Sequence, residues 1–361
     1  MQRSAEMKAL KIIRNIFLFV LLLLIAATVV FIVIFGKDIK TLHSVKDLGS
    51  GAYTMTFYKD YKFDEFLKTG AENDDEFFGF INKNLMHGLG PGKNALDGGC
   101  TAFVSRNEKG EVIFGRNFDF EEAPFLQLYT NPDNGYSSVS TVSLIAVGYG
   151  KDKSPASGIS TANFPMLAAP YLPCDGMNEK GVTAALLVVP VVSTVYDPDK
   201  VSINQTAAIR LILDKAASTD EAVELLRQYN VYFSSNLRTH ILIGDASGKA
   251  VIVEYYDGDL QVVSSGKDYQ IAANHIAYQD MNIFESPDSL ERYAAVEQVI
   301  TERDNKLDMN TCEELLNAIG LYNRDKSDRL QWSVVYDLTD KSGRIWPHRK
   351  NGSAWDFDLN K

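Results

Sequence analysis

The sequence predicts an α+β protein in which helices pack outside antiparallel sheets, preceded by a single membrane-spanning helix. Two observations favour this fold class. Strand-like segments are joined by short hairpin turns, and they do not alternate regularly with helices as they would around a parallel sheet. An uninterrupted apolar run of twenty residues near the N-terminus has no place in a globular pattern and has the length of a membrane span.

Most of the expected strands and helices follow residue 100. Two turn sequences, Asn107–Gly110 and Asp245–Gly248, separate apolar segments and predict hairpins. Ser218 and Glu221 form a capping box, which predicts where one helix begins. The expected strands are residues 101–105, 111–115, 140–148, 182–192, 239–244, 250–256 and 331–338. The expected helices are residues 206–217, 219–229, 289–303 and 311–321.

Composition argues against several classes of function. The formal net charge of −11 over 361 residues leaves no basic stripe for nucleic acid. Three cysteines without a C-x-x-C pair and five histidines without H-x-x-x-H spacing predict neither a metal site nor a cofactor. A disulfide between Cys174 and Cys312 stays open, since spacing alone does not establish geometry. Asn204-Gln-Thr206 fits the N-glycosylation pattern, which also occurs by chance.

The apolar run covers residues 16–35 and contains no charge. At about 1.5 Å per residue it matches the roughly 30 Å hydrocarbon core of a bilayer. A cleaved signal peptide is the alternative, but its apolar region would be shorter and would end in a small-x-small site. This run ends instead in the bulky residues Phe31 to Phe35. We therefore predict a transmembrane anchor at residues 16–36, after a cytoplasmic tail at residues 1–15.

The orientation of the anchor follows from its flanks. Basic residues lie on both sides of the span, with a slight excess before it, and positive charge favours the cytoplasmic side. The short tail before the span has nothing to fold. We therefore expect a single-pass protein of the cell membrane, with residues 37–361 outside the cytoplasm.

Residues 37–99 form a distinct stretch between the span and the predicted hairpins. It contains aromatic clusters around residues 53–61 and a helix-like segment at residues 77–80, and it closes in a turn-rich loop at residues 87–94. It can be read as a subdomain with a linker, and it also has the features of an excised pro-segment. Its aromatic side chains offer enough apolar area to keep it docked on the following chain, so we expect it to stay associated.

Cys100 opens a strand directly after this loop and follows two glycines. A lone cysteine at the start of a strand is most often a small buried hydrophobe. However, the second strand of the hairpin ends in Arg116 and Asp119, and the hairpin returns both toward Cys100. A cation beside a thiol lowers the thiol pKa, and a carboxylate beside an amine holds its charge. The alternative is an ordinary surface pair of Arg116 and Asp119.

This hairpin, from Cys100-Thr-Ala-Phe to Gly-Arg-Asn-Phe-Asp-Phe, resembles the start of the mature chain in the choloylglycine hydrolase family. The family comprises N-terminal-nucleophile hydrolases such as bile salt hydrolases and penicillin V acylases, with acid ceramidase-like amidases as relatives. Further resembling motifs follow in the family's order: Asp175-Gly-Met-Asn178-Glu-Lys-Gly181, Ala273-Asn274-His275, Ser289-Leu-Glu-Arg292-Tyr293 and Trp332-Ser-Val-Val-Tyr336-Asp337. The membrane span and the long segment before the cysteine depart from bile salt hydrolases and point to the broader amidase relatives.

The resemblance implies an αββα sandwich over residues 100–361 and self-cleavage between Gly99 and Cys100. Cleavage would make Cys100 both the nucleophile and, through its new α-amine, the base, since a free α-amine titrates near neutral pH and an amide nitrogen does not. The resemblance also implies roles for the other motif residues. Asn178 and Asn274 would hold the oxyanion, Arg116 would favour the thiolate, Asp119 would hold the α-amine, and Arg292 would brace the site.

The predicted function is that of a self-processing cysteine amidase, which hydrolyses the C–N bond of a small N-acyl compound through a thioester. An acyltransferase on the same fold is the first alternative, because pocket shape and water access decide between water and an amine as the acceptor. A non-catalytic, membrane-tethered binding protein is the second. The complete set of six site residues argues against the second alternative, since a binding protein does not need all of them.

Overall fold

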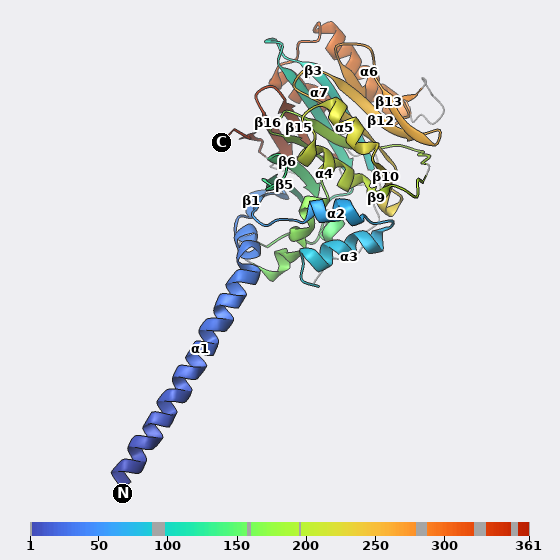
Figure 1. The fold of residues 1–361 in the computed structure, drawn as a ribbon. Coiled ribbons are helices and arrows are strands. Elements are labelled where there is room, and N and C mark those ends of the chain that lie inside the picture. Colours follow the sequence, from blue (N-terminus) through green and yellow to red (C-terminus); the bar gives the residue numbers. More distant parts are fainter. Residues whose placement is uncertain are drawn as a thin grey trace.

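The computed structural model describes residues 2–88, 98–156, 160–194, 196–278, 287–320, 330–347 and 353–360. Two β-sheets face each other, and helices cover their outer sides (Figure 1). A separate long helix, α1 (Gln2–His43), projects from this body. The layers of the body are therefore helix, sheet, sheet and helix, which is the αββα sandwich that the resemblance implied.

The larger sheet has nine strands and the smaller one has six. In spatial order the nine-stranded sheet contains β1 (Lys46–Gly49), β2 (Ala52–Phe57), β5 (Phe125–Thr130), β6 (Ser138–Ser143), β7 (Asp175–Asn178), β8 (Thr183–Val188), β11 (Thr239–Gly244), β12 (Ala250–Tyr256) and β13 (Asp259–Val263). The six-stranded sheet contains β14 (Gln270–Ala272), β3 (Gly98–Arg106), β4 (Val112–Phe120), β15 (Leu330–Asp337), β16 (Ser342–Pro347) and β17 (Trp355–Asp358). A small parallel pair joins β9 (Val201–Asn204) and β10 (Tyr229–Tyr232).

The helices of the body lie on both outer faces. The α-helices are α2 (Phe63–Thr69), α3 (Asp74–Asn84), α4 (Gln205–Lys215), α5 (Thr219–Leu226), α6 (Pro287–Glu302) and α7 (Met309–Ile319). The 3-10 helices are η1 (Leu144–Val147), η2 (Thr161–Tyr171) and η3 (Ser234–Asn236). Helices α4 and α5 pack on the nine-stranded sheet, α2 and α3 pack against β9 and η2, and α6 and α7 pack on the six-stranded sheet.

Three hydrophobic clusters hold these layers together. The first includes Phe66 and joins α2 to α5 to the nine-stranded sheet. The second lies between the two sheets and includes Cys100 and Trp332. The third includes Ile300 and Leu316 and joins α6 and α7 to the six-stranded sheet. Because side chains alternate along a strand, the inner face of β3 places Cys100 in the cluster between the sheets.

Most of the predicted elements agree with the structure within a few residues. Strands β11 and β12 have the predicted bounds, and helices α4 to α7 lie where the helical patterns placed them. The capping box is confirmed, since Ser218 Oγ accepts a hydrogen bond from the Glu221 N–H at 3.2 Å. The segment predicted as one strand at residues 140–148 is shorter, because β6 ends at Ser143 and the 3-10 helix η1 follows.

The expectation of antiparallel sheets is wrong at β2. This strand pairs in parallel with β5, from Ala52 opposite Phe125 to Phe57 opposite Thr130. The strand patterns did not reveal it, because a hairpin is a local signal whereas a parallel pair joins strands far apart in the chain. Consequently the stretch at residues 37–99 contributes two strands, β1 and β2, to the nine-stranded sheet.

Polar contacts also tie this stretch to the rest of the body. Tyr61 Oη donates to Asp214 Oδ2 of α4 at 2.7 Å, and both side chains are buried. Tyr171 Oη donates to the Tyr61 carbonyl oxygen at 2.8 Å. At the start of α3, Asp74 accepts hydrogen bonds from Ser234 Oγ and, at 3.0 Å, from the Ser235 N–H. The stretch is thus an integrated part of the fold.

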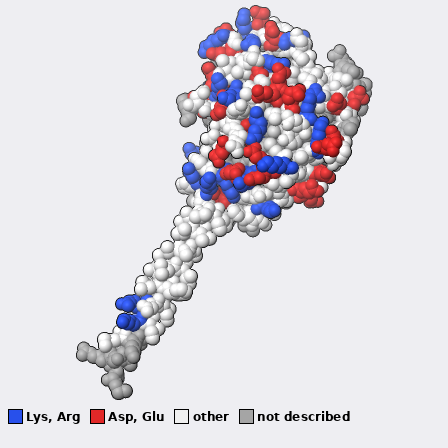
Figure 2. Space-filling model, in the orientation of Figure 1, with Lys and Arg blue, Asp and Glu red and all other residues white. Residues whose placement is uncertain are grey.

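Helix α1 is the one helix among the described residues that is long and apolar enough to cross a membrane. Its apolar side chains are exposed, and Figure 2 shows an uncharged shaft between the basic residues near its start and the body. The helix continues beyond residue 36, and its last turns enter the body. There Asp38 is 1% exposed and pairs with Lys59 Nζ at 3.0 Å and His87 Nε2 at 2.8 Å.

The cysteines are free thiols. Cys312, on α7, is buried in the cluster on the outer face of the six-stranded sheet, whereas Cys174 packs against the cluster between the sheets. The disulfide that the sequence left open is therefore absent from the structure.

Candidate active site

The hairpin of β3 and β4 brings Cys100 and Arg116 together. Cys100 lies opposite Phe118 and Ala102 lies opposite Arg116, so the thiol and the guanidinium share the inner face of the six-stranded sheet. Arg116 Nη2 donates to Cys100 Sγ at 3.4 Å, and the two residues are 0% and 1% exposed. The predicted meeting of a thiol and a cation is confirmed, and it occurs in the core between the sheets.

Arg116 is held by the nine-stranded sheet. Its Nη1 donates to Asp175 Oδ2 at 2.7 Å and to the Cys174 carbonyl oxygen at 2.6 Å, and its Nη2 donates to the Leu186 carbonyl oxygen at 2.6 Å. The alternative of a surface pair between Arg116 and Asp119 is wrong, because the ion-pair partner is the buried Asp175 on the opposite sheet. This buried network fixes the guanidinium beside the thiol.

Asp175 is a site residue that the sequence did not single out. Besides Arg116, its carboxylate accepts hydrogen bonds from Tyr336 Oη at 2.7 Å and Trp332 Nε1 at 3.2 Å. It is fully buried and begins the second of the resembling motifs. Its place at the start of that motif was the available signal, and its burial explains why it needs partners, because a buried carboxylate requires them.

Burial raises the pKa of the Cys100 thiol above its usual value, and the nearby Arg116 cation opposes this rise. Arg116 therefore favours the thiolate, but burial outweighs it while the peptide bond to Gly99 is intact. The thiol is protonated near neutral pH and requires a base in order to react.

Asp119 is fully buried and pairs in register with Gly99, so it lies beside the Gly99–Cys100 peptide bond. The negative charge of Asp119 raises the pKa of the Cys100 thiol, and a hydrogen bond from its backbone N–H lowers that pKa. A carboxylate at this point is suitably placed to hold a cation formed on the nitrogen of Cys100.

Asn274 lies directly at Cys100, just after β14. Its Oδ1 accepts from the Cys100 N–H at 2.8 Å and from Arg292 Nη2 at 2.8 Å. Its Nδ2 donates to the Val188 carbonyl oxygen at 2.7 Å. A side-chain amide carries two N–H groups, so in the described part of the chain one N–H of Asn274 Nδ2 is left without a partner.

Arg292, on α6, joins the same group from the outer face of the six-stranded sheet. Its Nη1 donates to the Cys100 carbonyl oxygen at 2.6 Å and also bonds Thr101 Oγ1. Asp288 on the same helix holds the guanidinium at 3.1 Å. Arg292 thus fixes the backbone of Cys100 and the orientation of Asn274.

Asn178 is not part of this group. Its Nδ2 donates to the carbonyl oxygens of Leu213 at 3.0 Å and Ala216 at 2.8 Å, at the end of α4. Its own N–H donates to the Val182 carbonyl oxygen at 2.9 Å. With these donors engaged in a buried turn on the outer side of the nine-stranded sheet, neither the side chain nor the backbone of Asn178 has the geometry of the expected oxyanion donor. Its contacts assign it a structural role.

A second buried pair supports the segment that carries Asn274. Glu254 accepts from His240 Nδ1 at 2.8 Å, and its two oxygens accept the N–H groups of Ala277 and Tyr278 at 2.9 Å each. On the other side, His275 Nδ1 lies 2.9 Å from Ser289 Oγ of α6. His275 is therefore a hydrogen-bonded neighbour of the site.

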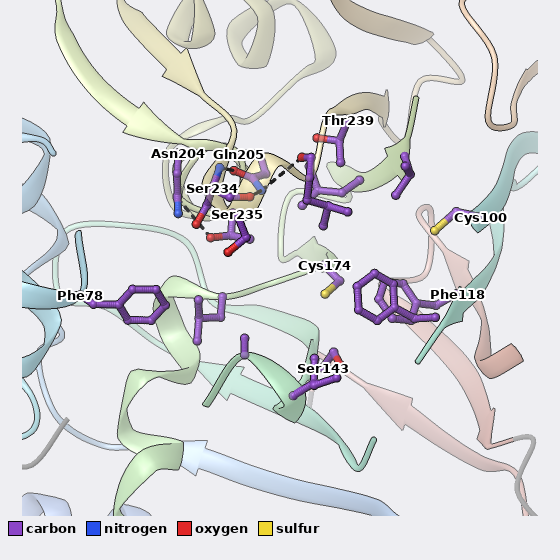
Figure 3. Close-up of a pocket in the computed structure, with 18 residues that line it drawn as sticks. Phe78, Cys100, Phe118, Ser143, Cys174, Asn204, Gln205, Ser234, Ser235 and Thr239 are labelled. Atoms are coloured by element: carbon purple, nitrogen blue, oxygen red, sulfur yellow. Dashed lines mark hydrogen bonds between the residues drawn. The ribbon is translucent and has the colours of Figure 1, made fainter. Parts of the chain in front are cut away.

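A pocket opens from Cys100 along the nine-stranded sheet. Figure 3 shows Cys100 on one side and Phe78 of α3 on the other, with Phe118 and Cys174 between them. Most of the lining is apolar near the thiol, and Phe78 belongs to the stretch before the predicted cleavage point. Burial raises the pKa of Cys174 to about 12, so this second thiol lines the pocket as a neutral group.

A group of carboxylates lies away from this pocket. The side-chain oxygens of Glu111, Asp337 and Asp340 lie within 4.8 Å of one another. Asp337 pairs with Ile113 near the opposite end of β4 from Asp119. These carboxylates do not take part in the site around Cys100.

Comparison with known protein families gives this geometry its context. Residues 100–321 match the linear amide C-N hydrolases, choloylglycine hydrolase family. This match covers more than half of the chain, and the protein belongs to that family. Linear amide C–N hydrolases are the enzymes that define this family.

Individual relatives agree with this assignment. The penicillin V acylase of Pectobacterium atrosepticum is 34% identical over 111 residues, which is 28% of this chain and 29% of that protein. The chain thus matches less than a third of the length of this relative. The structure of penicillin V acylase from Agrobacterium tumefaciens superimposes with a TM-score of 0.50 at 17% identity, covering 73% of this chain and 87% of the other. A mutant conjugated bile acid hydrolase from Clostridium perfringens gives 0.52 at 18% identity, covering 72% and 92%. At these identities the two structures show the shared fold.

Proposed function

We propose that this hydrolase is a self-processing cysteine amidase, anchored in the cell membrane, that cleaves N-acyl amides through a thioester on Cys100. The observation that carries the proposal is the contact set of Cys100. Its sulfur meets Arg116, its nitrogen meets Asn274, and its carbonyl oxygen meets Arg292. A merely structural cysteine does not require polar partners on all three groups.

Self-processing supplies the missing base. The raised pKa of the buried Cys100 thiol keeps it protonated, and an amide nitrogen cannot accept its proton. Cleavage of the Gly99–Cys100 bond releases an α-amine with an ordinary pKa near neutrality. This amine takes the thiol proton, and Asp119 lies beside it to hold the resulting charge. Arg116 stabilises the thiolate that forms.

The acyl transfer then follows from the same groups. Cys100 Sγ attacks the amide carbonyl carbon, and the remaining N–H of Asn274 Nδ2 donates to the oxyanion. The α-ammonium returns the proton to the leaving amine, which leaves an acyl thioester. Water adds to this thioester and releases the carboxylic acid together with the free thiol. Arg292 keeps Asn274 in position throughout.

Residues 37–99 act in this proposal as a retained subunit. The pairing of β2 with β5, the bond from Tyr61 to Asp214 and the wall residue Phe78 all support retention after cleavage. Because α1 is continuous with this segment, retention also keeps the catalytic chain at the membrane. The expected arrangement is a cytoplasmic tail at residues 1–15, a span at residues 16–36 and the catalytic domain outside the cytoplasm.

The proposal is tested with detergent-extracted full-length protein and a panel of N-acyl compounds. The panel contains conjugated bile salts, N-acyl amino acids, N-acylethanolamines, ceramide and penicillin V, and mass spectrometry follows the released amine and acid. We expect turnover of at least one compound and its loss in Cys100→Ala. An added amine acceptor separates the acyltransferase alternative, which would yield a new amide in place of the acid.

Absence of turnover across the panel, together with no acylation of Cys100, would contradict the proposed amidase.

A further inference from the structure

The pocket that begins at Cys100 changes character along its length. Near the thiol its wall is apolar, with Phe118, Leu186 and Val188. Farther along, Asn204, Gln205, Ser234 and Ser235 gather on one side, and Thr239 lies between this group and Cys100 (Figure 3). The lining residues are uncharged along the described wall. An acyl chain attached to Cys100 would therefore meet apolar surface first and neutral hydrogen-bonding groups afterwards.

Asn204 presents a buried donor to this part of the pocket. Its Oδ1 caps α4, accepting from the Ala207 N–H at 2.9 Å and from Thr206 Oγ1 at 3.1 Å. This orientation turns Nδ2 away from the helix, and among the residues described it has no hydrogen-bond partner. Asn204 is only 1% exposed, which also makes the glycosylation pattern at this position unusable.

Thr239 presents a second buried polar group. It is 1% exposed, it lines the pocket, and its Oγ1 has no hydrogen-bond partner in the described part of the chain. Thr239 pairs in register with Val188, whose carbonyl oxygen holds Asn274. A buried polar atom without a partner is destabilising, so Thr239 Oγ1, in the same pocket as the unbonded Nδ2 of Asn204, indicates a ligand that supplies the missing bonds.

The position of the start of α4 also supports a ligand in this pocket. Gln205 and Thr206, its first two residues, line the pocket, so the helix begins there. The N-terminal end of a helix carries partial positive charge and favours a hydrogen-bond acceptor. The bonds that Nδ2 of Asn204 and Oγ1 of Thr239 lack are thus best supplied by an oxygen atom. Because the described lining contains no cationic side chain, that oxygen need not carry a full charge.

We propose that the pocket selects an acyl group that is apolar beside its carbonyl carbon and carries a neutral oxygen farther along, and that Asn204 and Thr239 bind this oxygen. A hydroxyl, ether or ketone oxygen meets this description, whereas a purely aliphatic chain leaves both groups unpaired. The proposal rests on the amidase function and adds the class of acyl group to it.

The test compares matched anilides of a saturated fatty acid, its ω-hydroxy derivative and its ω-carboxy derivative, in chain lengths from hexanoyl to dodecanoyl. We expect kcat/KM for the best ω-hydroxy substrate to exceed that of its aliphatic counterpart roughly three- to tenfold, as one or two neutral hydrogen bonds provide. Thr239→Val keeps the shape of the side chain and removes Oγ1, and it should reduce this ratio severalfold. Asn204→Ser keeps an oxygen to cap α4 and should reduce the ratio as well.

Thr54→Val, on β2 and outside the pocket lining, is the matched control and should preserve the ratio of wild type. Two results would overturn the proposed subsite even if the amidase is active. One is that an aliphatic or ω-carboxy substrate is preferred at every chain length. The other is that Thr239→Val and Asn204→Ser leave the ratio of kcat/KM between ω-hydroxy and aliphatic substrates unchanged.

The subsite can also be tested without turnover, by measuring the binding affinity of the corresponding primary amides for the Cys100→Ala protein with calorimetry. The ω-hydroxy amide should bind several times more tightly than the aliphatic amide, and Thr239→Val should remove the difference. Equal affinities would contradict the subsite. Lack of turnover combined with selective binding would instead contradict the amidase function alone.

Discussion

The two sheets of this protein contribute different things to the site. The six-stranded sheet carries Cys100, Arg116 and Asp119 on one hairpin, and Asn274 follows its edge strand. The nine-stranded sheet supplies the counter-ion Asp175 and, together with the helices and loops around it, most of the pocket wall, and it incorporates strands from the stretch before Cys100. Cys100, Arg116 and Asp119 are thus brought together locally by one hairpin, whereas the surface that receives the substrate is built from distant parts of the chain.

The largest effect is expected at the hairpin. Cys100→Ala removes the proposed nucleophile, and activity should fall by more than about 10³-fold. The chain should also remain uncut, because we expect the same thiol to attack the Gly99–Cys100 bond in self-processing. Activity assays and denaturing gels read the two effects separately. Substantial turnover by the Ala variant would show that Cys100, on the six-stranded sheet, is not the nucleophile.

Substitution of two asparagines, one beside each sheet, compares a catalytic effect with a structural one. Asn274→Ala removes the proposed oxyanion donor and should lower kcat by about 10²- to 10³-fold. Asn178→Ala instead removes two buried hydrogen bonds to the end of α4, so it should lower the free energy of unfolding by about 1–3 kcal/mol. Steady-state kinetics and thermal unfolding of both variants check this. A kcat loss of similar size in the folded Asn178 variant would restore its predicted catalytic role.

Removal of a single hydroxyl group should weaken the association of residues 37–99 with the rest of the body. Tyr61→Phe removes the bond to the buried Asp214 and should weaken docking of residues 37–99 by about 1.5–3 kcal/mol. The measurement is the denaturant midpoint at which the catalytic chain leaves washed membranes. Tyr58→Phe is the matched control, because Tyr58 is 39% exposed. Release of the catalytic chain from wild-type membranes by salt alone would show that the stretch is only a pro-segment.

The smallest expected effect concerns acid stability. Burial lowers the pKa of His275 from 6.5 to about 4, with the nearby charge of His240 acting in the same direction. The folded state therefore binds this proton less readily than the unfolded state, and stability is lost as the pH falls from about 6.5 toward 4. His275→Gln should show a smaller fall in melting temperature between about pH 7 and pH 4.5. The exposed His43→Gln serves as control, and a fall in the His275 variant as large as in wild type would contradict this effect.

The sequence predicted the parts of the structure that depend on neighbouring residues. The hairpin turn at residues 107–110 placed Arg116 beside Cys100, and the capping box placed the start of α5. The αββα arrangement came from the resemblance of five ordered motifs. These features are local or recur throughout a family, so a single chain is sufficient to recognise them.

The parts that the sequence did not predict depend on contacts between the sheets. Asp175 was visible only as one residue of a motif, and its pairing with Arg116 requires the two sheets to face each other. Asn178 was assigned from the same motif, although its side chain points to the end of α4. The parallel pairing of β2 with β5 also lacks a local pattern. In each case the deciding partner is distant in the chain.

The central claim is that Cys100 becomes the N-terminal residue of the working enzyme. The direct measurement is intact-mass analysis and N-terminal sequencing of active protein extracted from membranes. The account predicts two associated chains, one of which begins at Cys100 and extends to Lys361, which is 262 residues (361 − 99). Fully active protein that contains only the uncut chain would contradict it, because the α-amine proposed as the base would not exist.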